Sequence, residues 1–132
     1  MAERPKILIV DDDLLVIESA REILEGAGYV VSARSQALGT SVFLLQDRPD
    51  IVLLDVEMPA LSGEALAAVI AAHSELRHVA IVFHSARRQA VLEDLVRRTG
   101  AIGAIQKTSD PRSFLAQLDS LVKRHRQRLS QA

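Results

Sequence analysis

The amino-acid sequence predicts an α/β fold in which a five-stranded parallel sheet is covered on both faces by five helices. Short apolar runs alternate along the chain with longer segments whose apolar residues recur at helical spacing. The strongest runs are continuous and rich in β-branched residues and leucine, which is typical of strands buried on both faces. Because crossovers between parallel strands are right-handed, this regular order favours a doubly wound sheet.

The first half of the chain contains three predicted strands and two predicted helices. Residues 7–10 form a continuous apolar run and are expected to be a central strand. An apolar stripe over residues 16–27 predicts the first helix, which ends among glycines. A weaker run at 29–33 predicts the second strand, and a less regular pattern at 38–45 predicts the second helix. The run at 51–54 is again continuous and predicts the third strand.

The second half repeats this alternation. Residues 63–72 are predicted as the third helix, and the apolar run at 79–83 is predicted as a central strand. The fourth helix is expected to end at Gly100, which is followed by a weaker strand at 101–105. The fifth helix has the clearest start, because an aspartate that can cap it precedes Pro111, a residue suited to the first helical position.

Composition restricts the class of protein further. With 132 residues, folding is expected to bury roughly two-thirds of the accessible surface, enough for a single core. The absence of cysteine excludes disulfides, thiolate metal sites and a thiol nucleophile. No apolar run reaches the length of a membrane span, and the first residues lack the pattern of a signal peptide. We therefore expect a cytoplasmic protein with no membrane partner.

Positive charge gathers at the end of the chain. Residues 111–132 hold five basic residues and one acidic residue, although the whole chain has a net charge of −1. Because no aromatic residue follows Phe114, this segment lacks side chains that stack on bases, and direct nucleic-acid binding is not expected. We expect one domain over residues 1–125, with residues 126–132 forming a basic tail or the start of a linker.

Acidic residues follow the first and third predicted strands. Asp11, Asp12 and Asp13 come after the first, and Asp55 and Glu57 come after the third. In the strand order 2-1-3-4-5, the flavodoxin-like arrangement, these two strand ends meet at one crevice. Carboxylates that meet there repel one another unless a cation neutralises them, and an all-oxygen set suits Mg²⁺. Helix capping is the alternative interpretation, which we favour for Asp13 but not for Asp11 and Asp12.

Two further polar residues are expected at the same edge of the sheet. Ser85 follows the fourth predicted strand and Lys107 follows the fifth. Together with Asp55 they form a set that can accept a phosphoryl group, because a carboxylate can attack phosphorus while an ammonium and a hydroxyl contact the phosphoryl oxygens. A general base is not required, since an aspartate is normally ionised at neutral pH. Strand alternation is expected to turn His84 to the opposite face.

These motifs resemble those of the receiver domains of two-component response regulators, of the single-domain chemotaxis-regulator type. The resemblance covers residues 6–122. The matching residues are the segments 7–12 and 51–55, Met58, Pro59 and Gly63, the pair Ser85-Ala86, and the segment 103–107. The spacings of 30 residues from Asp55 to Ser85 and 22 residues from Ser85 to Lys107 are also similar to those of the family.

The resemblance implies a role for each acidic residue. Asp55 is expected to be the phosphoacceptor and one of the ligands of Mg²⁺, which is the implied cofactor. Asp12 is expected to bind the ion directly, and Asp11 partly through water. The carbonyl oxygen of Glu57 is expected to complete the protein ligands.

The resemblance also implies the partners. Asp55 would receive its phosphoryl group from a histidine kinase or a phosphotransfer protein, Ser85 would follow the phosphoryl group, and Lys107 would pair with it. Binding to an output protein or domain, whose identity the sequence does not reveal, would then change. The chain would be a signalling domain rather than an enzyme, with self-catalysed phosphoryl transfer and autodephosphorylation at most.

Two positions depart from the pattern of the family, and a pair of further positions can tune its chemistry. Ala104 lies three residues before Lys107, where the family usually has an aromatic switch residue. Thr108 follows the lysine in place of the usual proline, so we expect a trans bond or a strained loop there. Glu57 and Arg87 each lie two residues beyond a site residue, where side chains can admit or exclude hydrolytic water.

Two alternatives belong to other functional classes. A protein-interaction module that signals without phosphorylation is favoured by Ala104 and Thr108 and opposed by the intact acidic set. A phosphohydrolase of the haloacid dehalogenase type is suggested by the Asp-x-Asp at Asp11, but Leu14 follows where that family has a Gly-Thr-rich turn. Phosphoryl label on Asp55, on Asp11 or on neither residue would distinguish the three.

Overall fold

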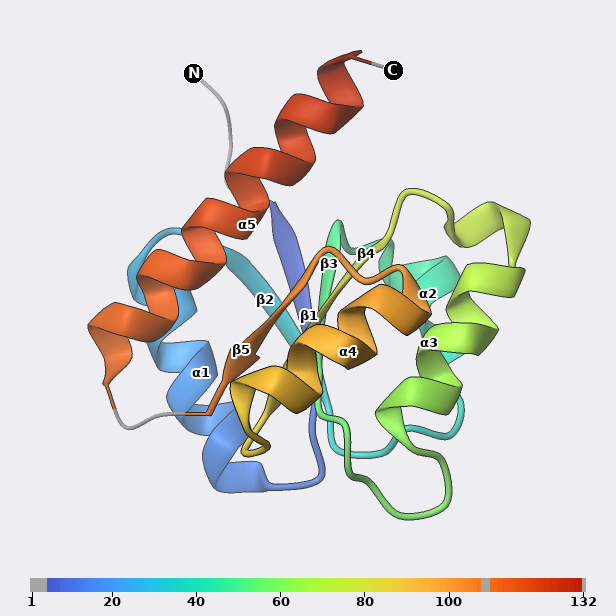
Figure 1. Cartoon of the computed structure of the whole chain (residues 1–132), viewed down its shortest axis with the longest axis horizontal. Coiled ribbons are helices and arrows are strands. Elements are labelled where there is room, and N and C mark those ends of the chain that lie inside the picture. Colours follow the sequence, from blue (N-terminus) through green and yellow to red (C-terminus); the bar gives the residue numbers. More distant parts are fainter. Residues whose placement is uncertain (1–4, 108–109, 132) are drawn as a thin grey trace.

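The computed structural model describes residues 5–107 and 110–131 and shows five strands and five α-helices in alternation, with one short 3₁₀ helix (Figure 1). In chain order the elements are β1 (Lys6–Val10), α1 (Leu14–Gly26), β2 (Val30–Arg34), α2 (Thr40–Asp47), β3 (Ile51–Leu54), α3 (Gly63–Ala72), η1 (Ser74–Leu76), β4 (Ala80–Ser85), α4 (Gln89–Thr99), β5 (Gly103–Gln106) and α5 (Pro111–Gln131).

The strands form one parallel sheet in the order β2-β1-β3-β4-β5, which confirms the predicted flavodoxin-like fold. The three runs predicted as central strands, β1, β3 and β4, lie at the centre. Since all strands run in the same direction, their carboxyl ends share one edge. β1 and β3 end level with each other, because Val10 pairs with Leu54.

Residues of the central strands alternate between two apolar layers. Ile7 and Ile9 belong to the cluster that contains the buried residues of α1 and α5. Leu8 and Val10 belong to the cluster that contains those of α2, α3 and α4. Figure 1 shows the same arrangement, with α1 and α5 on one side of the sheet and α2, α3 and α4 on the other. This double cover explains why the central strands are continuous apolar runs rather than alternating ones.

The strand boundaries differ from the predicted ones by one or two residues, except for β3, whose bounds match. β4 continues beyond residue 83 to Ser85, because Ser85 pairs with Gln106 of β5 and its carbonyl oxygen accepts a hydrogen bond from the Lys107 N–H at 2.6 Å. β5 begins at Gly103 rather than at residue 101, and β2 begins at Val30 rather than at residue 29. His84 and Ser85 are polar and therefore lie outside the predicted apolar run, but their pairing with β5 makes them part of the strand.

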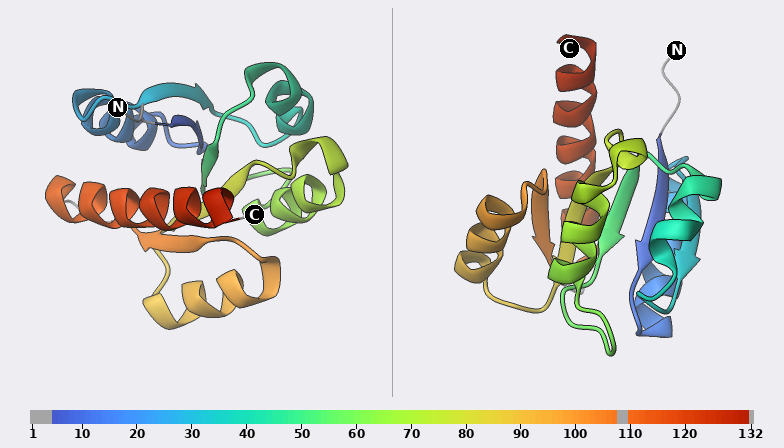
Figure 2. Two further views of the ribbon diagram at one scale, coloured as in Figure 1. Left: turned by 90° about the horizontal axis from the view of Figure 1, so that it is seen from above. Right: turned by 90° about the vertical axis from the view of Figure 1, so that its right-hand side faces the viewer.

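α5 is the longest helix and extends beyond the end of the sheet at which β1 begins (Figure 2). It continues without a break to Gln131, through residues 126–131 of the segment predicted as a basic tail. Within residues 5–107 and 110–131, no helix is long and apolar enough to cross a membrane.

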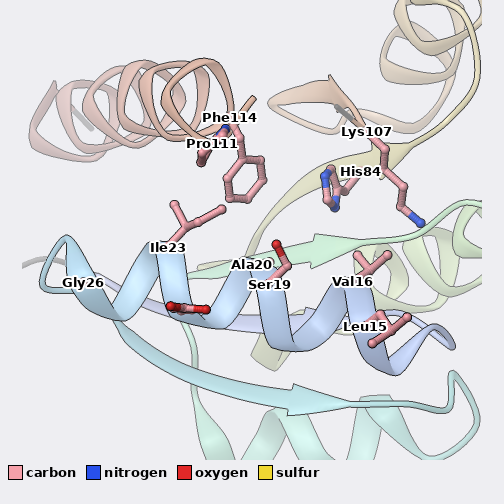
Figure 3. Close-up of a pocket in the computed structure, with 11 residues that line it drawn as sticks. Leu15, Val16, Ser19, Ala20, Ile23, Gly26, His84, Lys107, Pro111 and Phe114 are labelled. Atoms are coloured by element: carbon pink, nitrogen blue, oxygen red, sulfur yellow. The ribbon is translucent and has the colours of Figure 1, made fainter. Parts of the chain in front are cut away.

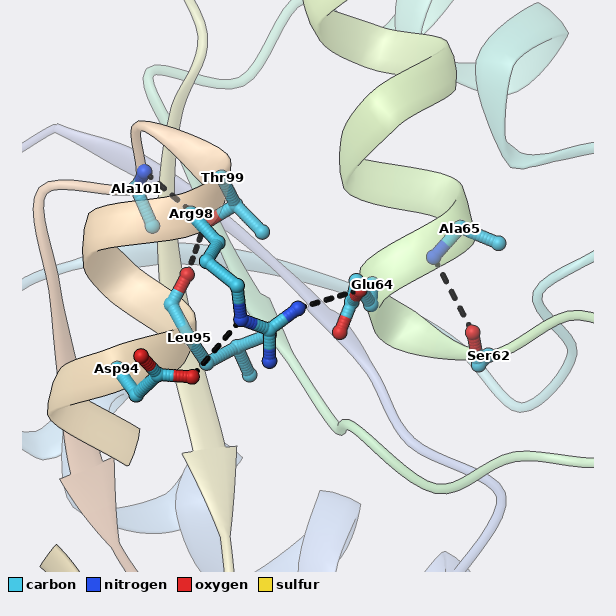
Figure 4. A network of polar contacts seen from close by, with 8 residues as sticks. All are labelled: Ser62, Glu64, Ala65, Asp94, Leu95, Arg98, Thr99 and Ala101. Atoms are coloured by element: carbon cyan, nitrogen blue, oxygen red, sulfur yellow. Dashed lines mark hydrogen bonds and ion pairs between the residues drawn. The ribbon is translucent and has the colours of Figure 1, made fainter. Parts of the chain in front are cut away.

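A polar network joins the first turn of α3 to the last turn of α4 (Figure 4). The Arg98 guanidinium donates hydrogen bonds to Glu64 on α3 and to Asp94 one turn earlier on α4, both at 2.8 Å. The pKa of Asp94 is lowered, first by the hydrogen bond from Arg98. Because all three side chains are about half exposed, we assign this network to helix orientation rather than to a binding site.

Candidate functional site

The carboxyl ends of four strands bring the predicted site residues together. Asp11 follows β1, Asp55 follows β3, Ser85 ends β4 and Lys107 follows β5. Asp11 and Asp55 are almost completely buried, and Asp12 is exposed at the mouth of the site. The carboxylates of these three residues each offer an oxygen, and the three oxygens lie within 4.8 Å of one another.

Asp13 has the separate role that the capping interpretation predicts for it. Its carboxylate accepts a hydrogen bond from the Leu15 N–H at 2.9 Å, which makes it the N-cap of α1. Its own N–H donates to Asp11 Oδ1 at 2.9 Å. The cap therefore helps to orient Asp11 while staying outside the group of three carboxylates.

Lys107 supplies the positive charge of the site. Its Nζ lies 2.9 Å from Asp11 Oδ2 and 3.4 Å from Asp55 Oδ1. Burial alone would lower the pKa of Lys107, but its interactions with Asp11 and Asp55 outweigh burial and raise that pKa. The lysine is thus held as a cation between the ends of β1 and β3.

Asp55 has a raised pKa. Burial is the main cause, because it disfavours the charged carboxylate, and the negative charge of Asp11 adds to the effect. Lys107 and a hydrogen bond from the Glu57 N–H act in the opposite direction without cancelling the rise. The carboxylate pair therefore remains incompletely neutralised by protein groups.

The donor set fits a magnesium ion. The three carboxylates offer only oxygen atoms, they lie close together, and Asp12 is open to solvent, so an ion there could keep several water ligands. A dication would also relieve the repulsion between Asp11 and Asp55. The Glu57 carboxylate is paired with Arg87 rather than with the three aspartates. The expected contribution of the Glu57 carbonyl oxygen to the metal site stays a prediction.

Ser85 lies at the same edge, with its hydroxyl held by the following loop. Ser85 Oγ accepts a hydrogen bond from the Arg87 N–H at 3.1 Å. The Arg87 side chain forms an ion pair with Glu57 at 2.7 Å, which links the loop after β4 to the loop after β3. The sequence analysis singled out both charged residues but did not predict that they pair. A signal for the pairing is present in the sequence, because the two residues have opposite charges and each lies two residues beyond a site residue, Asp55 or Ser85.

His84 lies on the opposite face from Ser85, as strand alternation predicts. Its ring packs against Phe114 of α5 with the ring centroids 5.1 Å apart. Burial, with a smaller contribution from Lys107, lowers the pKa of His84 to about 4.

Ala104 and Thr108, the two expected departures from the family pattern, have different outcomes. Ala104 is partly buried on β5 and borders a shallow surface pocket with Leu121 and Arg124 of α5, so only a methyl group occupies the position of the usual aromatic residue. Thr108 lies outside the described residues, and the expectation for its peptide bond stays a prediction.

Gly63 is a site residue that sequence reasoning counted only as a motif match and as the start of a helix. A Cβ at this position would lie 2.1 Å from the Asp55 carbonyl oxygen. The Gly63 N–H donates to the Val56 carbonyl oxygen at 2.8 Å. The absence of a side chain therefore lets α3 begin directly against the backbone of the proposed phosphoacceptor.

The family model of the response regulator receiver domain matches residues 7–119. The chain belongs to this family. The match includes all of the site residues described above and every strand apart from the first residue of β1, so this receiver domain carries its acidic set in the context of the family fold.

Curated relatives of this receiver domain are response regulators. It is 32% identical over 124 residues to the transcriptional regulatory protein CseB of Streptomyces coelicolor, and the alignment covers 94% of this chain and 52% of CseB. It is 34% identical over 125 residues to the DNA-binding response regulator MtrA of Mycobacterium tuberculosis, with 92% and 52% covered. The chain thus spans about half the length of these relatives.

Solved structures share the fold of this receiver domain. The chemotaxis protein CheY4 of Vibrio cholerae superposes with a TM-score of 0.81 at 22% identity, over 91% of this chain and 99% of CheY4. A CheY-like receiver domain protein from Methanospirillum hungatei gives a TM-score of 0.78 at 25% identity, over 96% and 99%.

Proposed function

We propose that this receiver domain accepts a phosphoryl group on Asp55 from a histidine kinase or a phosphotransfer protein, in a reaction that depends on Mg²⁺, and that phosphorylation changes its binding to an output partner. One observation carries the proposal. Lys107 Nζ lies between Asp11 and Asp55, 2.9 Å and 3.4 Å from their oxygens, in a cluster of carboxylates that suits a dication.

Asp55 is the proposed nucleophile. One of its carboxylate oxygens would form a new bond to phosphorus while the bond between phosphorus and the donor's imidazole nitrogen breaks. That nitrogen keeps the electron pair of the broken bond, so no proton has to leave Asp55 when the carboxylate is ionised. The product is an acyl phosphate.

Asp11, Asp12 and Asp55 would hold the metal ion. When bound, Mg²⁺ would offset negative charge on the phosphoryl oxygens. Lys107 would turn from its two carboxylates toward a phosphoryl oxygen, which its position between them allows. Ser85 would give up its hydrogen bond from the Arg87 N–H, and its hydroxyl would donate a hydrogen bond to another phosphoryl oxygen.

Incubation with acetyl phosphate and Mg²⁺ tests the acceptor directly. Intact-mass spectrometry should show one added phosphoryl group that is labile to base, and Asp55→Asn should prevent the addition. Asp13→Asn is the matched control, because Asp13 is a neighbouring carboxylate that caps α1, and asparagine also caps well. Equal labelling of Asp55→Asn and the unaltered protein would contradict the proposal.

The same experiment separates the two other functional classes. Label on Asp11 would indicate phosphohydrolase chemistry, and no label under conditions that bind Mg²⁺ would indicate a module that signals without phosphorylation.

Titration with Mg²⁺ tests the metal site: Asp12→Ala should weaken the affinity for Mg²⁺ about tenfold or more, because it removes one of three carboxylates. Unchanged affinity would show that the proposed site is wrong.

A further inference from the structure

The apolar stripe of α5 continues beyond the residues that the helix buries. Its buried residues, of which Val122 is the last, pack in the apolar cluster shared with α1 and β1. Leu129 follows Val122 by seven residues, a spacing that keeps both side chains on one face of a helix. Because α5 extends beyond the sheet at this level (Figure 2), the Leu129 side chain stays 54% exposed. Residues 123–131, the end of α5, therefore present an apolar contact point.

Every charged side chain at the end of α5 is basic. Lys123, Arg124 and Arg128 are exposed, and Arg126 is partly exposed. No acidic residue follows Asp119 in the sequence, and among the described residues no carboxylate forms an ion pair with Lys123, Arg124 or Arg128. Arg124 and Arg128 lie one turn apart, so their charges repel each other. A partner that supplies negative charge would stabilise this end of the helix.

The surroundings of this end narrow the class of partner. A second copy of the chain that paired end to end would bring the same basic residues together. α1 lies beside α5, with a cavity between them that Ile23, His84 and Phe114 line (Figure 3). α1 also carries the exposed acidic residues Glu18 and Glu22. An extended polyanion lying along α5, such as a duplex or a membrane surface, would approach these carboxylates, whereas a compact acidic protein surface needs to contact only the end.

We propose that residues 123–131 bind an acidic amphipathic helix of a partner protein. Apolar residues of that helix would cover Leu129, and its carboxylates would pair with Arg126 and Arg128, which flank Leu129 on a helix of 3.6 residues per turn. The charge and the apolar stripe thus point to the same occupant. This proposal does not depend on phosphorylation of Asp55.

A designed peptide tests the class of partner. The probe is a labelled peptide of about three heptads with leucine at the core positions and glutamate at the flanking positions. Fluorescence anisotropy with the full chain should show one saturable site, whose affinity falls about fivefold or more between about 50 and about 200 mM salt. The same peptide with lysine in place of glutamate should not bind. Equal binding of the two peptides, or no saturable binding of the acidic one, would overturn the proposal.

A matched pair of charge reversals tests the location. Arg128→Glu should weaken binding of the acidic peptide about fivefold or more, since it replaces an attraction by a repulsion. The same change makes the pair with Arg124 attractive, so loss of the helix would not explain the result. Arg112→Glu is the control, because Arg112 is exposed in the first turn of α5, about 24 Å away along the helix, and it should change affinity less than about twofold. Equal effects of the two reversals would overturn the site.

A second pair of variants tests the apolar contact. Leu129→Ser should weaken peptide binding about threefold or more, because it removes the exposed end of the stripe. Val42→Ser should leave binding unchanged, since Val42 is 63% exposed on α2, which covers the other face of the sheet. Equal binding by Leu129→Ser and the unaltered protein would overturn the role of the stripe.

The other occupants are excluded in the same experiments. Sedimentation of the chain without peptide should show no self-association that Arg128→Glu abolishes, and such self-association would assign the end of α5 to a second copy. Duplex DNA and anionic vesicles should bind more weakly than the acidic peptide. Tighter binding of either, with the same loss in Arg128→Glu, would overturn the assignment to an acidic protein.

Discussion

Without a metal ion, the ionised form of Asp55 is unfavourable in the folded protein. It is buried beside a second carboxylate, Asp11, and its pKa is raised even though Lys107 and the Glu57 N–H interact with it. A side chain whose pKa is higher in the folded than in the unfolded state stabilises the fold at low pH, and this contribution is lost as pH rises through the folded-state pKa. At neutral pH the ionised Asp55 therefore opposes folding.

Asp55→Asn should make the metal-free protein more stable at pH 7. The change removes the repulsion with Asp11 and keeps the shape of the side chain, so we expect a rise of a few degrees in Tm. The advantage should shrink as pH falls toward the ordinary aspartate range, because Asp55 is then protonated in the unaltered protein. Saturating Mg²⁺ should reduce or reverse it, since the ion stabilises the unaltered protein more. A lower Tm for Asp55→Asn in chelator would contradict this account.

His84 should make the protein sensitive to acid. Its pKa is lowered to about 4 by burial and by the nearby Lys107, so its contribution to stability is complete above the ordinary histidine pKa of 6.5 and is lost as pH falls toward 4. The loss over this interval is on the order of 3 kcal/mol. Urea unfolding of His84→Leu should therefore show a flatter decline in stability between pH 7 and pH 4.5 than the unaltered protein shows, and parallel declines would refute the prediction.

The end of β3 and the start of α3 are packed so closely at the site that no added side-chain atom fits between them. Ser62 caps α3 by accepting a hydrogen bond from the Ala65 N–H at 3.1 Å, and Gly63 lies against the carbonyl group of Asp55. The end of β3 and the start of α3 are thus held against each other by backbone contacts. The ion pair between Arg98 and Glu64 then connects α3 to α4.

Gly63→Ala should destabilise the fold and disturb the site together. Its Cβ would have to move away from the Asp55 carbonyl oxygen, and because that oxygen belongs to the backbone, α3 or the end of β3 must shift. We expect a loss of about 1–3 kcal/mol in the free energy of unfolding and slower labelling of Asp55 by acetyl phosphate.

Gly26→Ala is the control for that variant. Gly26 ends α1, and a Cβ there would meet nothing within 4 Å. The alanine should leave stability unchanged or raise it by up to about 1 kcal/mol. A similar response of both variants in urea unfolding would show that contact with Asp55 is not the cause.

For the molecule as a whole, the open question is how phosphorylation would reach the surface. Only a methyl group is available at Ala104 on β5, so no large side chain there can change its rotamer. The loop after β4 is a more direct route, because the Ser85 hydroxyl is hydrogen-bonded to the Arg87 N–H and the Arg87 side chain is paired with Glu57. A movement of Ser85 toward a phosphoryl group would break the first of these contacts.

We therefore expect activation to alter residues 86–88 and α4 more than the region around Ala104. Hydrogen exchange with and without beryllofluoride, an acyl-phosphate mimic, measures this, because a change in loop order alters local opening free energies. Exchange in α4 should change more than exchange in β5 and α5. Dominant changes around Ala104 and α5 would refute this route, and no change anywhere would favour the module that signals without phosphorylation.

Local patterns in the sequence predicted the strands, their order, the N-cap role of Asp13 and the convergence of Asp11, Asp55, Ser85 and Lys107. These features depend on hydrophobic periodicity and on the common direction of parallel strands, which neighbouring residues encode. The apolar runs could not predict that β4 extends to Ser85, because pairing with β5 rather than hydrophobicity makes those residues a strand.

Contacts between distant segments became visible only in three dimensions. The approach of Gly63 to Asp55, the pairing of Glu57 with Arg87, and the cavity that His84 shares with α1 and α5 depend on how loops and helices pack across the sheet. Packing at this level depends on shape and distance between side chains far apart in the chain, and periodicity carries no information about either. A histidine between an apolar run and a serine therefore looks unremarkable in sequence, although the fold buries it with one ring nitrogen lacking a partner among the described residues.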